Sequence, residues 1–88
     1  MIKLIKFGAD FCAPCHAMST ILEEIQPQFK DQIQIEEVDT NTAEHDLLVK
    51  YKIRNIPVLV IEKDGVEIWR HVGTISKEDL ESKIKEYI

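Results

Sequence analysis

The 88-residue sequence has few of the features that anchor a chain in a membrane or crosslink it internally. It contains two cysteines, three glycines and three prolines. Its apolar runs are short, and lysines interrupt the amino-terminal run over residues 1–7. That run is too short and too polar for a signal peptide or a membrane-spanning helix. We therefore expect a chain without a membrane segment that acts in the cytoplasm.

Acidic residues outnumber basic ones. Eleven Lys and Arg residues stand against 16 Asp and Glu residues, which gives a formal net charge of −5, and no basic cluster stands out. Nucleic acids and anionic membranes both require concentrated basic surface, so neither is an expected partner. The remaining composition is that of a globular domain with room for one hydrophobic core. We expect a single domain over residues 1–88 and a monomer.

Hydrophobic periodicity and turn residues predict the element order βαβαββα. The first helix has Pro14 in its first turn and is expected to kink or end before Pro27. Asn41 and Glu44 have the spacing of a capping box for the second helix, and Ser76 with Asp79 suggests the cap of the third. The predicted strands cover residues 2–7, 33–38, 56–61 and 66–72.

The connections between these elements predict the topology of the sheet. The first two strands are joined by a helix, so they should be parallel with a right-handed crossover. The last two are joined through Lys63-Asp64-Gly65, which is a hairpin turn signal, so they should be antiparallel. The prediction is an α/β fold with a four-stranded mixed sheet and helices on both faces.

Two cysteines separated by Ala13 and Pro14 carry the predicted chemistry. Cys12 and Cys15 are too close in sequence to crosslink distant segments, and in a reducing compartment such a pair favours redox chemistry or metal binding. At the start of a helix, unpaired N–H groups and the macrodipole lower a thiol pKa. We predict that Cys12 is the attacking thiolate and that Cys15, which is deeper, resolves the mixed disulfide. Pro14 would stiffen the loop.

Three other interpretations of the pair remain open. The cysteines could be inert buried thiols, or they could bind zinc with His16, although no second ligand pair follows. Residues 12–16 also match the C-x-x-C-H attachment motif of c-type haem, which requires export and an axial ligand. We expect no metal and no cofactor. His16 itself is expected on the helix surface, where it could modestly tune the field at the cysteines.

The sequence resembles the thioredoxin family. Ala9–Cys15 is similar to the active-site stretch of that family, with Phe11 where tryptophan is usual and Ala13 where glycine is usual. The resemblance covers essentially the whole chain, but the family's usual first strand and helix are absent. It therefore implies a thioredoxin-like fold without those two elements. The other matching segments are Tyr51–Pro57, Lys63–Gly65 and Val72–Gly73.

The resemblance also implies a function and a substrate site. It implies that Cys12 and Cys15 reduce disulfides in protein substrates and receive electrons from a thioredoxin-reductase-type donor. In the family, the proline that matches Pro57 is cis and faces the disulfide. The peptide group that matches Ile56 binds the substrate backbone as a short antiparallel strand pairing.

Lys6 departs from the family pattern. It occupies the position of a buried aspartate that is thought to assist proton transfer at the resolving cysteine, a role that a charged lysine cannot fill. The sequence leaves three interpretations open for Lys6. Its amine could stabilise a nearby thiolate, pair with Glu36 or Glu37 on the neighbouring strand, or extend into solvent.

Two rival functions remain. The first is a glutaredoxin-like enzyme that depends on glutathione, which the short length fits. Ala13-Pro14 in place of Pro-Tyr, and the lack of a Gly-Gly pair after the strand at Pro57, speak against it. The second is a non-catalytic module that keeps the fold and binds partners in the groove beside Pro57.

Overall fold

A four-stranded mixed sheet lies at the centre of the structure, a computed structural model that describes residues 2–88. The elements follow the order βαβαββα, as predicted. The strands are β1 (Ile2–Gly8), β2 (Ile33–Asp39), β3 (Val58–Lys63) and β4 (Val66–Val72). The helices are α1 (Ala13–Ile25), α2 (His45–Lys50) and α3 (Lys77–Tyr87), with a short 3-10 helix, η1 (Gln26–Phe29), after α1.

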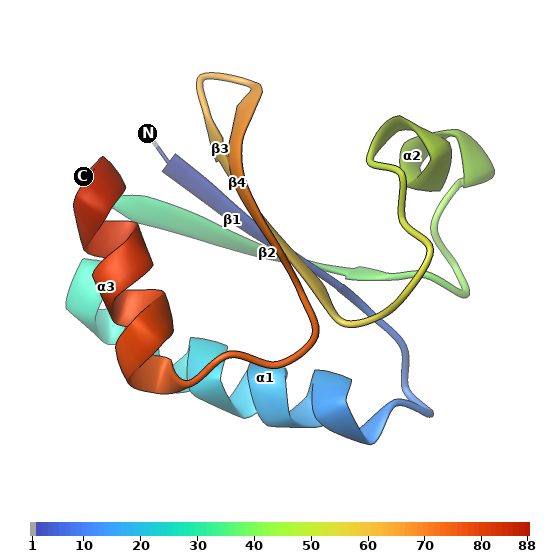
Figure 1. The fold of residues 1–88 in the computed structure, drawn as a ribbon, viewed down its shortest axis with the longest axis horizontal. Helices are drawn as coiled ribbons and strands as arrows, with labels where there is room; N and C mark the ends of the chain where they lie inside the picture. The colour runs from blue at the N-terminus through green and yellow to red at the C-terminus, as the bar shows by residue number, and fades with distance from the viewer. Residues whose placement is uncertain (1) are drawn as a thin grey trace.

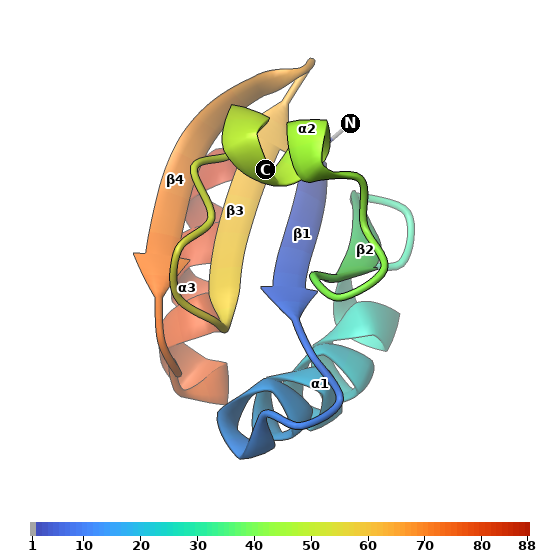
Figure 2. The same cartoon turned by 90° about the vertical axis from the view of Figure 1, so that its right-hand side faces the viewer.

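The strands are arranged in the order β2-β1-β3-β4, as Figure 2 shows. β1 is parallel to β2, while the β1–β3 and β3–β4 pairs are antiparallel. Asp64 and Gly65 join β3 to β4, and both have positive φ, at 53° and 83°. A two-residue hairpin turn of this kind favours Asp-Gly because both residues tolerate a left-handed backbone. The predicted mixed sheet and hairpin are therefore confirmed.

Helices cover both faces of the sheet, as predicted (Figure 1). α1 and α3 pack on one face and α2 lies on the other. Adjacent residues of β1 point their side chains to opposite faces of the sheet, because side chains alternate along a strand. Leu4 belongs to the core under α1 and α3, and Ile5 belongs to the core on the α2 side. The larger core includes Leu4, Met18, Leu22, Ile25, Leu59, Ile61, Leu80 and Ile84.

Helix ends follow the local sequence in two of three cases. α1 ends at Ile25, and Pro27 lies in the first turn of η1, where its missing N–H does no harm. The Ser76 hydroxyl accepts a hydrogen bond of 3.1 Å from the Asp79 N–H and caps α3.

None of the helices within residues 2–88 is long and apolar enough to cross a membrane.

Two local predictions were wrong. The capping box at Asn41 does not form, because Asp39 accepts the Asn41 N–H with its carboxylate at 2.8 Å and the chain makes a turn there. The N-cap of α2 is Glu44, without a side-chain hydrogen bond. β3 begins at Val58 rather than at Ile56. The proline at position 57 has no N–H to contribute to a strand ladder, which accounts for the later start.

Candidate active site

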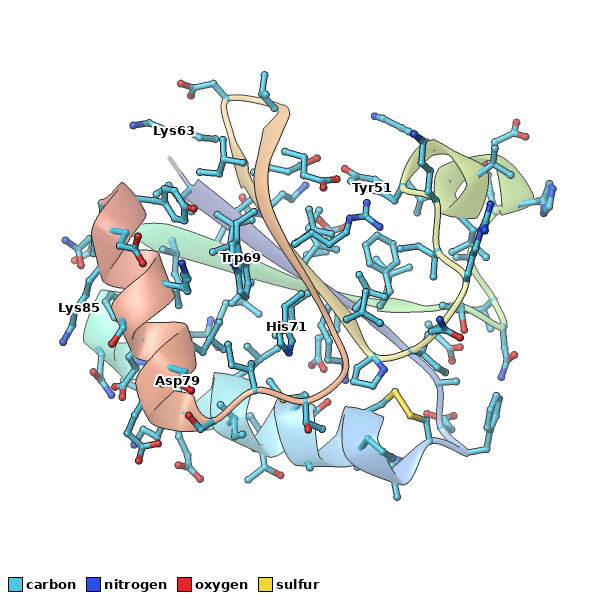
Figure 3. The ribbon with its side chains drawn as sticks, viewed as in Figure 1. Tyr51, Lys63, Trp69, His71, Asp79 and Lys85 are labelled. Atoms are coloured by element: carbon cyan, nitrogen blue, oxygen red, sulfur yellow. A yellow bond between two sulfur atoms is a disulfide. The ribbon has the colours of Figure 1, made fainter. Side chains whose placement is uncertain are left out.

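Cys12 and Cys15 form a disulfide at the amino-terminal end of α1, with their Cα atoms 5.2 Å apart. The disulfide is the yellow bond in Figure 3, at the start of the helix. β1 ends at Gly8, and a short loop carries the chain to Cys12, the N-cap residue of α1. The strand and the helix together therefore fix the position of the cysteine pair.

The helix terminus provides a hydrogen bond to the first sulfur. The backbone N–H of Cys15 donates to Cys12 Sγ at 3.2 Å. This N–H is one of those at a helix start that lack an intrahelical acceptor. When the disulfide is reduced, the same donor and the helix dipole favour negative charge on Cys12. Cys12 keeps 9% of its surface exposed, whereas Cys15 keeps 1%, so Cys15 is the deeper residue, as predicted.

Exposed side chains surround Cys12. Phe11 is 76% exposed beside it, and Ala13 and Pro14 are exposed in the first turn of α1. His16 is also exposed, on the helix surface as predicted, and its Nε2–H donates to the Asp10 carbonyl at 2.6 Å. This bond ties the first turn of α1 to the loop that precedes it.

Lys6 is buried directly behind Cys15. The residue is 7% exposed, and its Nζ donates to the Cys15 carbonyl at 3.2 Å and to the Ser19 hydroxyl. It also forms an ion pair of 2.8 Å with Glu37 Oε1. The predicted pairing with Glu37 is confirmed, and the interpretation in which the amine reaches solvent was wrong. Glu36 pairs with Lys3 instead, at 2.7 Å.

Ser19 completes a three-residue network. Its hydroxyl accepts from Lys6 and donates to Glu37 Oε1 at 2.6 Å. The hydrogen bond from Lys6, and then that from Ser19, lower the pKa of the Glu37 carboxyl. Ser19 was not among the predicted site residues, although its position in the sequence carries a signal. Ser19 is four residues after Cys15 in the helix, so both side chains lie on the same face.

A cavity of about 220 Å³ joins this network to Cys15. Gly8 lies on its wall. A Cβ on this glycine would lie 3.0 Å from Cys15 Cβ and 3.1 Å from Cys15 Sγ, so a larger residue could not approach as closely. The lining residues are Lys6, Gly8, Ala9, Asp10, Cys15, His16, Ser19, Glu37, Val38 and Asp39.

A second hollow, of about 450 Å³, lies between the active-site loop and the segment before β3. Phe11 and Ile56 both line it, and Arg54 and Asn55 contribute polar groups. The Ile56–Pro57 peptide bond is cis, as the resemblance implies. Substrate binding at Ile56, and the position of Pro57 opposite the disulfide, stay predictions.

Metal ligands do not gather near the cysteines. Among residues 2–88, no group of three or more His, Cys, Asp or Glu residues is arranged to hold a metal ion. The ring of His16, the third ligand in the zinc interpretation, is bonded to the Asp10 carbonyl.

Known proteins are similar to this sequence along most of its length. The thioredoxin family model matches residues 1–86. Thioredoxin C-2 of Corynebacterium nephridii is 39% identical over 97% of this chain and 78% of its own length. Thioredoxin 1 of Synechococcus elongatus is 34% identical, with the same coverage of each chain.

Solved structures agree with these matches. A thioredoxin-2, described as a component of malaria parasite protein secretion machinery, superposes with a TM-score of 0.93 over 99% of this chain and 84% of its own. At 24% identity, that likeness supports the fold alone. A mutant thioredoxin from Halobacterium salinarum is 27% identical, with a TM-score of 0.89 over 98% of this chain and 74% of its own. With its cysteine pair at a helix start and these matches over nearly its full length, the chain belongs to the thioredoxin family of thiol–disulfide oxidoreductases.

Proposed function

We propose that this protein reduces disulfide bonds in other proteins, with Cys12 as the attacking thiolate and Cys15 as the resolving thiol. The observation that supports this assignment is the 3.2 Å hydrogen bond from the Cys15 N–H to Cys12 Sγ at the start of α1. The more exposed sulfur therefore lies where a negative charge is stabilised, and the buried sulfur lies within bonding distance behind it.

In the first step, the Cys12 thiolate attacks one sulfur of the substrate disulfide. A mixed disulfide forms between Cys12 and the substrate, and the other substrate sulfur leaves as a thiolate that takes up a proton. In the second step, the Cys15 thiol loses its proton and attacks Cys12 Sγ. The second substrate thiolate leaves, and the Cys12–Cys15 disulfide holds the oxidised state. Two electrons have then passed from the protein to the substrate.

Residues around the pair would hold the substrate. Phe11 and Ile56 line one hollow, which places an exposed aromatic ring and the peptide before Pro57 on the same surface. We infer that a substrate strand pairs with the Ile56 peptide group and passes over the exposed Phe11, Ala13 and Pro14. His16 would tune the charge at the cysteines without touching the substrate, and Lys6 would do so only to the extent that Glu37 leaves its cation uncompensated.

Members of the thioredoxin family act on disulfide substrates and are typically reduced by thioredoxin reductase. We propose the same relations for this chain, which would act as a cytoplasmic, monomeric, single-domain protein over residues 1–88. The proposal includes no metal, organic cofactor, nucleic acid or membrane partner. The cysteine pair is sufficient to carry both electrons.

Trapping tests the assigned roles. Cys15→Ser should accumulate substrates as mixed disulfides on Cys12, which mass spectrometry can identify, because the resolving thiol is gone. The matched control, Cys12→Ser, should trap little. If the substrates accumulate on Cys15 in the control instead, the two roles are reversed.

An insulin-reduction assay tests the reaction itself. The wild-type protein should reduce insulin disulfides with dithiothreitol as the electron donor, and Cys12→Ser should not. Failure of the wild-type protein would favour a binding module, especially if Cys12→Ser still binds partners. Turnover with glutathione as the only donor would favour the glutaredoxin-like alternative.

A further inference from the structure

A buried cation lies against the resolving cysteine. The Lys6 ammonium contacts the Cys15 carbonyl at 3.2 Å, and Lys6 is 7% exposed. Inside a protein the dielectric constant is lower than in water, so a charge acts more strongly on its neighbours. An uncompensated cation at this place would favour the thiolate form of Cys15.

The cation is compensated from the neighbouring strand. Lys6 and Glu37 are direct partners in the β1–β2 register, and the Glu37 carboxylate lies 2.8 Å from the Lys6 ammonium. The Ser19 hydroxyl bonds to both groups. Together, Lys6 and Glu37 carry no net charge, so their effects on a nearby sulfur largely cancel.

We propose that Glu37 and Ser19 are positioning residues: the Glu37 carboxylate neutralises the Lys6 cation and the Ser19 hydroxyl bridges the two groups, so that Cys15 stays a protonated thiol until it attacks Cys12. This proposal rests on the attacking and resolving roles proposed above. It adds that negative charge in the reduced protein is confined to Cys12, the more exposed of the two cysteines. The substrate therefore meets one thiolate rather than two.

The cavity connects the charged network to Cys15. Lys6, Ser19, Glu37 and Cys15 all line it, so the three residues of the network and the second cysteine share one space. When Cys15 attacks, its proton passes to water. The other titratable groups on the cavity wall are Asp10 in the loop, His16 in α1 and Asp39 at the end of β2. They are unchanged in every variant below, so comparisons between variants cancel their contributions.

The test measures the pKa of Cys15 in a Cys12→Ser background, from the ultraviolet absorbance of its thiolate against pH. Glu37→Gln leaves the Lys6 cation uncompensated and should lower the Cys15 pKa by about one unit, a tenfold change in ionisation. Lys6→Met leaves the carboxylate alone and should raise it by a smaller amount. The double variant should return close to the parent value.

The ion pair Lys3–Glu36 is the matched control, because it joins the same two strands. Lys3→Met and Glu36→Gln should leave the Cys15 pKa unchanged. Shifts in the same direction for Glu37→Gln and Lys6→Met would overturn the proposal, since a purely structural disturbance does not reverse sign. No shift in either variant would also overturn it.

Two further points keep the test decisive. If Glu37→Gln does not fold, Lys6→Met suffices, because an unbranched apolar side chain of similar length packs well in a core; an unchanged or lower Cys15 pKa would then refute the proposal. Insulin reduction and substrate trapping by the wild-type protein report on the proposed function independently. A protein that reduces insulin but shows no opposite shifts loses only this inference.

Discussion

Two ion pairs join the same two strands and have nearly the same length, yet their surroundings differ. Lys3–Glu36 spans 2.7 Å with side chains that are 37% and 45% exposed. Lys6–Glu37 spans 2.8 Å, and its glutamate is similarly exposed, at 48%, but the lysine side chain is only 8% exposed. The pairs lie on opposite faces of the sheet, because Lys3 and Lys6 differ in strand parity.

The comparison shows that contact distance does not measure the importance of an ion pair. An exposed pair gains little, because water already solvates both charges and salt screens them. A buried lysine depends on its partner, since removal of the carboxylate leaves a charge that water solvates only in part. The depth of the lysine therefore decides which pair the fold and the active site require.

The largest difference should appear when each carboxylate is removed. We expect Glu37→Gln to lower the free energy of unfolding by about 1–3 kcal/mol, because it strands the buried ammonium of Lys6. We expect Glu36→Gln to change it by less than about 0.5 kcal/mol. Urea unfolding of both variants measures the two values. Equal losses would show that burial does not separate the pairs.

Removal of the bridging hydroxyl should have an intermediate effect. Ser19→Ala takes one hydrogen bond from Lys6 and one from Glu37, and we expect a loss of about 0.5–1.5 kcal/mol in the free energy of unfolding. Thr20→Ala is the control on the same helix, because its exposed hydroxyl donates to the His16 carbonyl, at 3.3 Å. A loss in Ser19→Ala no larger than in the control would contradict this prediction.

Acid should weaken the Lys6–Glu37 pair. The pKa of Glu37 in the folded protein lies below its ordinary value of 4.5, chiefly because Lys6 donates to it. Its contribution to stability is therefore present above that value and is lost as the pH falls through the folded-state pKa. The acid loss of stability in the wild-type protein should exceed that in Glu37→Gln. Parallel pH curves for the two proteins would refute this.

Alkali should weaken the exposed pair instead. The hydrogen bond to Glu36 raises the pKa of Lys3 above its ordinary value of 10.5, so this contribution is complete below that value and is lost as the pH rises through the folded-state pKa. Tyr51 also titrates there, since burial raises its pKa to about 12. Wild type must therefore be compared with Lys3→Met, in which Tyr51 is unchanged. A steeper alkaline loss in Lys3→Met would be the wrong sign.

The smallest expected effect is that of salt. Ions screen exposed charges more than buried ones. The stability difference between wild type and Lys3→Met should therefore shrink between low and high salt, by a few tenths of a kcal/mol at most. The difference between wild type and Lys6→Met should stay nearly constant. Unfolding curves at two ionic strengths provide both values.

Much of the fold could be predicted from the sequence, because its signals are local. Apolar periodicity gave the order of the elements, and Asp64-Gly65 specified a hairpin turn that few other residues allow. The capping box at Asn41 failed because Asp39, at the end of a strand, competes for the same backbone N–H. The outcome of that competition depends on where β2 ends, which the periodicity does not specify.

The active site, like the fold, could be predicted from the sequence only where its features are local. The position of Cys12 and Cys15 at a helix start could be predicted, since both the motif and the helix are local features. The partner of Lys6 could not be chosen between Glu36 and Glu37 without the strand register, because a shift of one residue reverses the face of every side chain. Ser19 could be assigned to the site only from the packing of α1 on the face of the sheet that carries Lys6.

The direct register between positions 6 and 37 also constrains how this protein can evolve. A lineage that loses the lysine gains nothing by keeping the acid, and one that loses the acid first must pass through an intermediate with a stranded charge. The two positions should therefore change together among descendants of this sequence, while positions 3 and 36 drift independently. The contact between Lys6 and Glu37 would then appear as correlated substitutions at positions 6 and 37 in an alignment of those descendants.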